Sequence, residues 1–356
     1  MSTEFEAAGA HFGNPLVEQR SLAAGEAVVE LPDRSVVTVT GPDRLSWLDS
    51  LTSQSIASLQ PGESAETLLL DPTGRLEHAM RVVDDGETTW LLVDGPEGAP
   101  LAAWLDRMRF MLRVEVADRS AEFLTVGAFE GSAAVELTER FASAPNGVPL
   151  VWADPWREVV VGGHQYSTAT EHPAADWTYR EVLVARGTDL SSLPHAGTLA
   201  LEALRVAAWR PRLSTEVDER SIPHELDWLR SAVHLSKGCY RGQETIAKVH
   251  NLGHPPRRLV LLHLDGSESP VPPPAGSPVL LDGAEVGRVT SPALHAELGP
   301  IALAVVKRSV DPAAALVVGG EVPVAASQEV IVPTDAGAEA NVPRLPKLGR
   351  VARPAS

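Results

Sequence analysis

A single cysteine, Cys239, lies in the segment KGCYRGQET. A lone cysteine cannot form a disulfide within the chain, and zinc or iron–sulfur sites take several ligands from one chain. Three uses remain: an inert buried thiol, a reactive thiol, or a thiol that bonds transiently to another molecule. Gly238 and Gly242 permit tight turns, while Lys237 and Arg241 bring positive charge that favours a thiolate. The pattern therefore predicts a sulfur presented on a turn.

The surrounding segment is basic within an acidic protein. Residues 237–258 contain five Lys or Arg side chains and one glutamate, whereas the whole chain has 30 basic and 47 acidic side chains and a formal charge of −17. The segment is either a solvated basic face or an anion site for a ligand with carboxylates or phosphates. The overall charge argues against direct nucleic-acid binding and against contact with an anionic membrane surface.

A glutamate upstream of the cysteine is a candidate ligand contact. Glu225 lies in IPHELDW, beside the apolar residues Leu226 and Trp228. An ordinary glutamate is exposed. A carboxylate that is partly buried beside an aromatic ring suits a heterocycle with adjacent N–H donors, and a pterin presents such a pair through a ring N–H and its amino group.

Several other site motifs are missing. The sequence contains no G-x-G-x-x-G, G-x-x-x-x-G-K-[ST] or G-x-S-x-G, so dinucleotide, P-loop and α/β-hydrolase sites lack their signatures. His250 and His254 are four residues apart, but Gly253 and Pro255 break the helix that would align them, and we expect no metal held by this chain alone. Without a run of 18 apolar residues or a basic–apolar leader, we expect a cytoplasmic protein.

The hydrophobic periodicity predicts an α+β protein with several domains. Strands are predicted over residues 34–41, 65–95 (three strands), 114–129 and 158–170, and helices over 43–56, 100–112, 176–189, 197–213 and 243–251. In the helix over 100–112 we expect Trp104, Met108 and Met111 on the buried face. The expected units are an N-terminal α+β domain (1–120, completed by later segments), a middle α+β domain ending in KGCYRGQET (121–256), a small β-barrel (257–333) and a flexible tail (334–356).

The segment KGCYRGQE resembles the signature K-G-C-Y-x-G-Q-E of the YgfZ family, the folate-binding, iron–sulfur-linked relatives of the glycine-cleavage T-protein, an aminomethyltransferase. Further similarities follow in the same order along the chain: GPDRLSWLDSLTSQSI, LLLDPTGRL, LEALRVAAWRPRL, PHELDW, GAEVGRVTS and IALAVV. The resemblance implies three domains around a central cavity that binds tetrahydrofolate or a derivative, with a small C-terminal β-barrel. It also implies a role in assembling or repairing iron–sulfur clusters in client proteins, including enzymes of tRNA modification.

The resemblance also assigns roles to individual residues. Cys239 would be the functional thiol. Its loop would contain Lys237, Gly238, Tyr240, Arg241, Gly242, Gln243 and Glu244. Contacts to the folate would come from Glu225, Arg205, Asp71, Arg75 and Tyr166.

Two departures separate this chain from the T-protein. The T-protein follows its glycine-rich hairpin with paired aspartates, the second of which serves aminomethyl transfer, and this chain has Ala79 there, which cannot handle a proton. The T-protein's Phe-Ile-Gly-Arg is replaced by YRGQ, so its arginine is absent. His224 and Asp227 stand at variable positions of the YgfZ pattern.

The sequence therefore predicts a tetrahydrofolate-binding accessory protein for iron–sulfur proteins. Two alternatives remain. The first is a folate-dependent aminomethyl- or methyltransferase in which His78 acts as the base. The second is a thiol-based redox sensor or scaffold that binds no folate and uses Cys239 alone.

Overall fold

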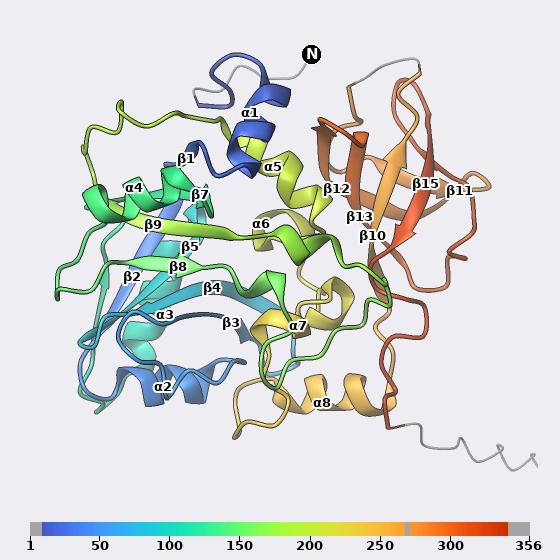
Figure 1. Ribbon diagram of the computed structural model, residues 1–356. Coiled ribbons are helices and arrows are strands. Elements are labelled where there is room, and N and C mark those ends of the chain that lie inside the picture. Colours follow the sequence, from blue (N-terminus) through green and yellow to red (C-terminus); the bar gives the residue numbers. More distant parts are fainter. Residues whose placement is uncertain (1–8, 268–270, 341–356) are drawn as a thin grey trace, which may run out of the picture.

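The chain forms two antiparallel sheets and a closed barrel, joined by short helices (Figure 1). The computed structural model describes residues 9–267 and 271–340. In Figure 1 the two sheets lie on the left and the barrel on the right, with α7 and α8 beneath the space between them. The α+β class and the C-terminal barrel predicted from the sequence are confirmed.

The five-stranded sheet is built from the first third of the chain. Its strands, in spatial order, are β3 (Ser64–Leu70), β4 (Leu76–Asp84), β5 (Thr88–Asp94), β2 (Arg34–Thr40) and β6 (Glu115–Asp118). Helices α2 (Arg44–Leu51) and α3 (Gly98–Met108) and the short η1 (Gly95–Glu97) accompany it. Side chains alternate along each strand, so Met80 and Leu91 pack under α2 and α3. Val83 and Trp90 face the other way, into the core that the two sheets share.

The buried face of α3 differs from the expected one. Leu101 and Leu105 are buried against the sheet, and Trp104 packs partly against the same core. Met108 is 48% exposed and Met111 is 84% exposed. The prediction for these two methionines is wrong: Met108 is the last residue of α3, and Met111 lies beyond the helix, so the helical spacing does not extend to it.

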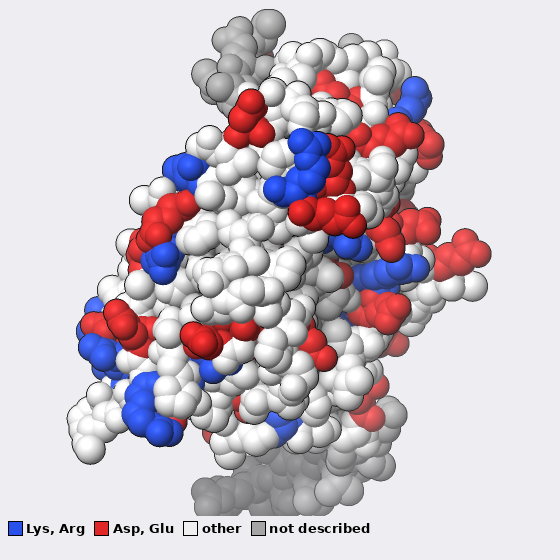
Figure 2. All heavy atoms as spheres, turned by 60° about the vertical axis from the view of Figure 1, so that its left-hand side comes forward, with Lys and Arg blue, Asp and Glu red and all other residues white. Residues whose placement is uncertain are grey.

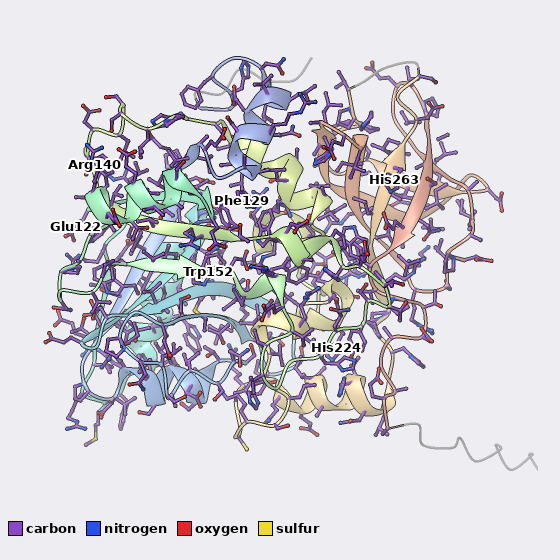
Figure 3. All side chains as sticks on the ribbon, in the orientation of Figure 1. Glu122, Phe129, Arg140, Trp152, His224 and His263 are labelled. Atoms are coloured by element: carbon purple, nitrogen blue, oxygen red, sulfur yellow. The ribbon has the colours of Figure 1, made fainter. Side chains whose placement is uncertain are left out.

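The four-stranded sheet draws on more distant segments. Its strands, in spatial order, are β1 (Val28–Leu31), β7 (Phe123–Phe129), β9 (Tyr179–Ala185) and β8 (Val151–Ala153). Helix α4 (Ser132–Phe141) covers its outer face through Leu137, which joins Val126 and Val182 in a small core. Trp152 and Phe129, labelled in Figure 3, belong to the core shared with the five-stranded sheet. Nearby lie α1 (Pro15–Ala23), η2 (Pro155–Arg157) and η3 (Pro173–Asp176).

Two sequence predictions in this region are wrong. The segment 176–189, predicted as a helix, forms β9, which pairs with β7 on one side and β8 on the other. The segment 158–170, predicted as two strands, forms no strand and instead hydrogen-bonds to the backbone of a helix further along the chain. The N–H of Val160 donates to the carbonyl of Arg230 (2.9 Å), and the N–H of His164 donates to that of Leu229 (3.1 Å).

Short helices connect the sheets to the barrel. They are α5 (Thr198–Ala207), α6 (Leu213–Glu216), η4 (Pro223–Leu226), α7 (Leu229–Ala232) and α8 (Gln243–Leu252). The helices predicted over 197–213 and 243–251 are confirmed as α5 and α8. Helix α5 buries Ala200, Ala203 and Val206, so small side chains allow its close approach to the core.

The barrel closes the C-terminal part of the described chain. Its strands, in spatial order, are β10 (Arg257–Leu264), β13 (Gly299–Lys307), β12 (Ala284–His295), β11 (Pro278–Leu281), β14 (Leu316–Val318) and β15 (Val324–Val330). Alternate residues of β10, such as Val260 and Leu262, fill the barrel. Leu259 and Leu261 point outward into the main core, and the barrel therefore packs firmly on the rest of the protein.

The predicted tail begins in contact with α8. The N–H of Glu339 donates to the carbonyl of His250 (2.9 Å), and that of Ala340 to the carbonyl of Asn251 (3.2 Å). The remainder of the tail, 341–356, lies outside the described residues. Among the helices described, none has the length and apolar character needed to cross a membrane. On the face shown in Figure 2, acidic and basic side chains are intermixed around a broad uncharged area.

Candidate functional site

The only cysteine lies on an exposed loop between α7 and α8. We call residues 233–242 the thiol loop; the Cys239 side chain is exposed on it. The loop ends at Gly242, which has a left-handed backbone (φ 82°) and immediately precedes α8. The expectation of a sulfur presented on a turn is confirmed for its exposure.

A glycine contact fixes the thiol loop against the β3–β4 hairpin. A Cβ atom on Gly74 (φ 83°) would lie 2.6 Å from the Cβ of Thr245. A Cβ atom on Gly242 would lie 2.7 Å from the carbonyl oxygen of Asp71. Both positions therefore accept only glycine, on conformational and on steric grounds. This contact places the hairpin tip directly against the start of α8.

Asp71 and Arg75 shape this hairpin. The Asp71 carboxylate accepts hydrogen bonds from the N–H groups of Thr73 (2.7 Å) and Arg75 (2.9 Å) and from the Thr73 hydroxyl. Burial opposes ionisation, but these donors outweigh it and lower the pKa of Asp71. The Arg75 side chain is exposed. Asp71 is therefore occupied as a turn-forming residue.

Lys237 is buried under the thiol loop rather than beside the sulfur in solvent. Its Nζ donates to the carbonyl oxygens of Asp49 (2.6 Å), Thr52 (3.0 Å) and Gln54 (2.7 Å), and lies 3.2 Å from the Asp49 carboxylate. The side chain is 3% exposed, and burial lowers the pKa of Lys237 although Asp49 opposes this. Its charge is therefore directed at carbonyls in the last turn of α2 and just after it, where a helix end leaves carbonyls without partners.

Arg241 ties the thiol loop to the five-stranded sheet. Its guanidinium pairs with the Glu77 carboxylate on β4 and lies 5.5 Å from the centre of the Trp104 ring on α3. The expected effect of Arg241 on the thiolate is therefore reduced, because a carboxylate already neutralises its charge. Nearby, His78 Nδ1 lies 2.7 Å from a Glu97 carboxylate oxygen. Burial lowers the pKa of His78, although Glu97 and Glu77 oppose it.

The remaining residues of the signature support the loop. The Gln243 amide donates to the carbonyl of Lys237 (3.2 Å), which closes the thiol loop onto α8. Tyr240 is buried, and burial raises the pKa of its hydroxyl, which has no hydrogen-bond partner among the described residues. Glu244 is exposed on the first turn of α8.

Glu225 is buried in η4 and is held by an arginine of the barrel. Arg257 donates from Nε to one Glu225 oxygen (3.0 Å) and from Nη2 to the other (2.8 Å). The same guanidinium donates to both oxygens of Asp218 (2.6 and 3.0 Å). Burial opposes the charge of Arg257, but its hydrogen bonds to both carboxylates raise the pKa of Arg257. The hydrogen bond from Arg257 lowers the pKa of Asp218. No partner for Glu225 could be predicted from its neighbours in sequence, because Arg257 lies 32 residues away.

Asp227, two residues beyond Glu225, is the least expected group of the site. It is fully buried and adopts a left-handed backbone (φ 55°), which is uncommon for a residue other than glycine. Its Oδ1 accepts the N–H of Tyr166 (2.7 Å), whereas Oδ2 has no partner among the described residues. Burial raises the pKa of Asp227 to about 7. Asp227 stands at a variable position of the YgfZ pattern, and its surroundings could not be predicted because they come from a segment 61 residues upstream.

Tyr166, whose backbone N–H binds Asp227, belongs to a cluster of aromatic and histidine rings. The Tyr166 hydroxyl lies 3.1 Å from His250 Nδ1, and the His164 ring centre lies 4.8 Å from that of Tyr166. His224 Nε2 lies 3.1 Å from the carbonyl of Ile246, which places the His224 ring between η4 and α8 (Figure 3). Burial lowers the pKa of His224 to about 3, so the ring is neutral. Tyr166 thus contacts the segment that follows η4 through Asp227, whereas Glu225 is bound by Arg257.

Arg205 does not belong to this cluster as a free donor. Its Nε donates to Glu202 (3.0 Å), Nη1 to Glu216 (3.1 Å) and Nη2 to the Ser291 hydroxyl (2.5 Å). All three nitrogens therefore have partners, and Arg205 joins α5, α6 and the barrel. The prediction that Arg205 contacts the folate stays a prediction.

A pocket elsewhere carries none of the predicted folate contacts. It has a volume of about 1130 Å³ and lies between α1 and the barrel. Its lining includes Leu16, Leu199, Pro292 and Leu294. Within the described ranges, no three histidine, cysteine, aspartate or glutamate side chains form a group suited to a metal ion.

Two antiparallel sheets joined to a small closed barrel form the fold of the glycine-cleavage T-protein. The crystal structure of the glycine cleavage system aminomethyltransferase T from Bartonella henselae superimposes with a TM-score of 0.68 at 17% identity, covering 93% of this chain and 95% of that chain. Residues 257–336 match the family model of the glycine cleavage T-protein C-terminal barrel domain.

The curated relatives carry names of two kinds. An iron-sulfur cluster assembly factor IBA57 homolog, mitochondrial, of Mycosarcoma maydis is 24% identical over 70% of this chain and 59% of its own length. An aminomethyltransferase of Geobacillus kaustophilus is 29% identical over 82% of both chains. The chain thus spans about three fifths of the first relative. The chain is therefore similar to an iron–sulfur cluster assembly factor and to an aminomethyltransferase, and its C-terminal barrel to that of the glycine cleavage T-protein.

Proposed function

We propose that this protein binds tetrahydrofolate or a derivative non-covalently and assists the assembly or repair of iron–sulfur clusters in client proteins, with Cys239 as its functional thiol. The observation that carries the proposal is the exposed Cys239 side chain on the thiol loop, which contacts with other elements hold in place. The assembly factor of Mycosarcoma maydis supports the iron–sulfur role, since it is a relative over most of this chain.

Three contacts of the thiol loop hold Cys239 at one position on the protein surface. Lys237 holds the thiol loop to the carbonyls after α2, Arg241 holds it to β4, and Gly242 holds it to the hairpin. Three separate elements thus fix a loop whose cysteine has no structural role in the core. A sulfur that is exposed but positioned suits a transient contact with a client protein.

The Glu225 region supports the folate part of the proposal. Each carboxylate oxygen offers two acceptor positions, and Arg257 uses one on each Glu225 oxygen. The remaining positions suit the paired N–H donors of a pterin. Tyr166 and its neighbouring histidine rings add aromatic surface for a flat heterocycle.

Calorimetry without oxygen tests the folate site. We expect 5-formyltetrahydrofolate to bind the wild-type protein, and Glu225→Gln to weaken binding by about 1–3 kcal/mol, the cost of stranding a buried polar partner. Asp218→Asn is the matched control, because it removes the other carboxylate of Arg257 and leaves Glu225 in place. Absence of binding to the wild-type protein would contradict the folate assignment and favour a thiol scaffold. An equal loss in both variants would assign the effect to Arg257.

Complementation tests the thiol. In the organism that encodes this chain, we expect deletion to lower iron–sulfur enzyme activity under oxidative stress, and Cys239→Ser to fail to restore it. The control moves the thiol three residues along the same loop, by combining Cys239→Ser with Ser236→Cys, since Ser236 is also exposed. Full activity with Cys239→Ser would refute a functional role for this sulfur.

A second candidate is aminomethyl transfer, which the His78–Glu97 contact favours. A histidine held by a carboxylate is a common form of general base. Ala79, at the position of the expected aspartate, is buried and belongs to the core between the sheets. If the protein transfers a one-carbon unit to tetrahydrofolate in vitro and His78→Gln abolishes that transfer, this candidate replaces the accessory role.

A further inference from the structure

The loop between α3 and β6 exposes a run of apolar side chains. We call residues 107–113, RMRFMLR, the apolar tip. Phe110 is 89% exposed, more than any other large hydrophobic side chain among the described residues, and Met111 is 84% exposed. Met108 and Leu112 are exposed beside them. Contiguous exposed apolar side chains mark interaction sites, whereas single scattered ones do not.

The fold does not explain the conformation of Phe110. Its backbone is left-handed (φ 44°), which suits glycine or asparagine and is uncommon for a bulky side chain. This backbone costs free energy, and a ring that stays in water returns none of it through burial. Stability alone would therefore place glycine or asparagine here. A strained residue that presents an aromatic ring to solvent is typical of a contact site that trades stability for function.

The apolar tip and the thiol loop contact opposite ends of α2. The Arg113 guanidinium lies 2.5 Å from the carboxylate of Asp43, the residue before α2. The Lys237 Nζ lies 3.2 Å from the carboxylate of Asp49, in the last turn of α2. The two aspartates are six residues apart, about 9 Å along a helix. In Figure 1, α2 and the thiol loop lie along the lower edge of the molecule.

Helix α3 provides a second connection between the apolar tip and the thiol loop. Met108 lies four residues beyond Trp104, on the same side of α3 and one turn further along. The Arg241 guanidinium of the thiol loop lies 5.5 Å from the centre of the Trp104 ring. An ordinary protein–protein contact covers about 800 Å² of each partner, a patch about 30 Å across. One partner can therefore cover both the apolar tip and Cys239.

The charge of the apolar tip favours a protein partner over a membrane. The tip contains three arginines and no acidic residue. Arg109 lies 2.8 Å from Asp106 and Arg113 lies 2.5 Å from Asp43, so two of the three charges are paired, in a chain of net charge −17. Attraction to an anionic membrane takes a cluster of several basic side chains. Phenylalanine, methionine and arginine are enriched at protein–protein contacts, where carboxylates of the partner complement the arginines.

We propose that the apolar tip docks the iron–sulfur client protein, with Phe110 and Met111 inserted into an apolar cleft of the client whose rim carries carboxylates. The inference rests on the proposed function and names the surface that brings a client to Cys239. A client seated on the apolar tip also covers the thiol loop, so the exposed sulfur lies within the same contact.

Phe110→Asn tests the docking surface, because asparagine suits the left-handed backbone and removes the ring. In the complementation assay we expect this variant to restore at least tenfold less iron–sulfur enzyme activity than the wild-type protein. Its unfolding midpoint should be equal to that of the wild-type protein or higher, so a loss of fold is not the cause. Phe12→Asn is the matched control, since Phe12 is 61% exposed before α1, and it should restore full activity.

A photoreactive side chain at position 111 identifies what docks. In cells, we expect Met111→p-benzoylphenylalanine to cross-link to a protein that mass spectrometry identifies as an iron–sulfur protein. Adding Phe110→Asn should reduce this adduct at least tenfold. A cross-link to a second copy of this chain would overturn the inference. So would sedimentation with vesicles of equal parts phosphatidylcholine and phosphatidylglycerol that is lost in Phe110→Asn.

Cys239→Ser separates the failure of this inference from the failure of the proposed function. If Cys239→Ser and Phe110→Asn both restore full activity, the proposed function and the docking surface both fail. If only Cys239→Ser loses activity, the docking inference alone is overturned. The cross-link from position 111 decides the question if Phe110→Asn does not fold.

Discussion

Lys237 is the residue whose role the structure changes most, and its replacement by methionine separates two explanations. The sequence places this lysine beside the thiol as an activator. In the structure its Nζ serves three backbone carbonyls, at 2.6, 3.0 and 2.7 Å, and is shielded from solvent. Lys237→Met keeps the length of the stem but removes every one of these hydrogen bonds.

The magnitude follows from the stranded carbonyls. Each buried acceptor left without a donor costs about 1 kcal/mol or more, and relief from burying an ammonium group offsets part of the sum. We expect Lys237→Met to lower the free energy of unfolding by about 3 kcal/mol, more than a hundredfold in the unfolding equilibrium constant.

Denaturant unfolding and thiol alkylation together provide the assay. We expect a lower unfolding midpoint for Lys237→Met and the same pH profile of Cys239 alkylation as in the wild-type protein at low denaturant. Lys248→Met is the matched control, since Lys248 is exposed on α8 and should change stability by less than about 0.5 kcal/mol. An unchanged unfolding midpoint with a shifted alkylation profile would show that Lys237 activates the thiol and does not stabilise the thiol loop.

Three further predictions concern the same region. Gly242→Ala should lower the free energy of unfolding by about 2 kcal/mol in thermal or denaturant scans, because its Cβ would lie 2.7 Å from the Asp71 carbonyl oxygen. Gly238→Ala, which meets no atom within 4 Å, should be neutral. Equal effects of the two variants would contradict the glycine contact. Arg241→Ala should cost less than about 1 kcal/mol in the same scans, because its ion pair is partly exposed, but should raise hydrogen exchange in the thiol loop; unchanged exchange would argue against a tether. Burial raises the pKa of Asp227 to about 7, so above the ordinary carboxyl value near 4 the folded chain keeps a proton that the unfolded chain has released. Stability therefore falls as the pH rises through this window, and Asp227→Asn should remove that slope when midpoints at about pH 5 and pH 8 are compared.

Local patterns were sufficient where a structure is formed by neighbours in sequence. The turns around Cys239, the helix α5 and the short strands of the barrel all follow from glycines, helical spacing and strand-length apolar runs. Strand β9 could not be recognised in this way. It lies between two other strands and is apolar on both faces, so EVLVA shows no alternation to distinguish a strand from a helix.

In the candidate site, too, residue types can be recognised locally, whereas contacts between distant segments cannot. The sequence identifies Cys239, Glu225 and the surrounding glycines by residue type. It cannot show that Arg257 holds Glu225, or that the N–H of Tyr166 fixes Asp227, because these partners lie 32 and 61 residues away. Charge near a residue in sequence also misleads: Lys237 and Arg241 flank the cysteine in the chain, yet both turn to other elements.

The solitary thiol has a consequence for how any sulfur chemistry at this site must end. An oxidised or sulfur-loaded cysteine is usually released by a second, resolving cysteine nearby. This chain has none, since Cys239 is its single cysteine. Any adduct on Cys239 must therefore be removed by an external thiol or passed to a client, and the exposure of the thiol loop leaves the sulfur open to both. Recovery of the free thiol would then depend on the reducing partners of the cell rather than on the protein itself.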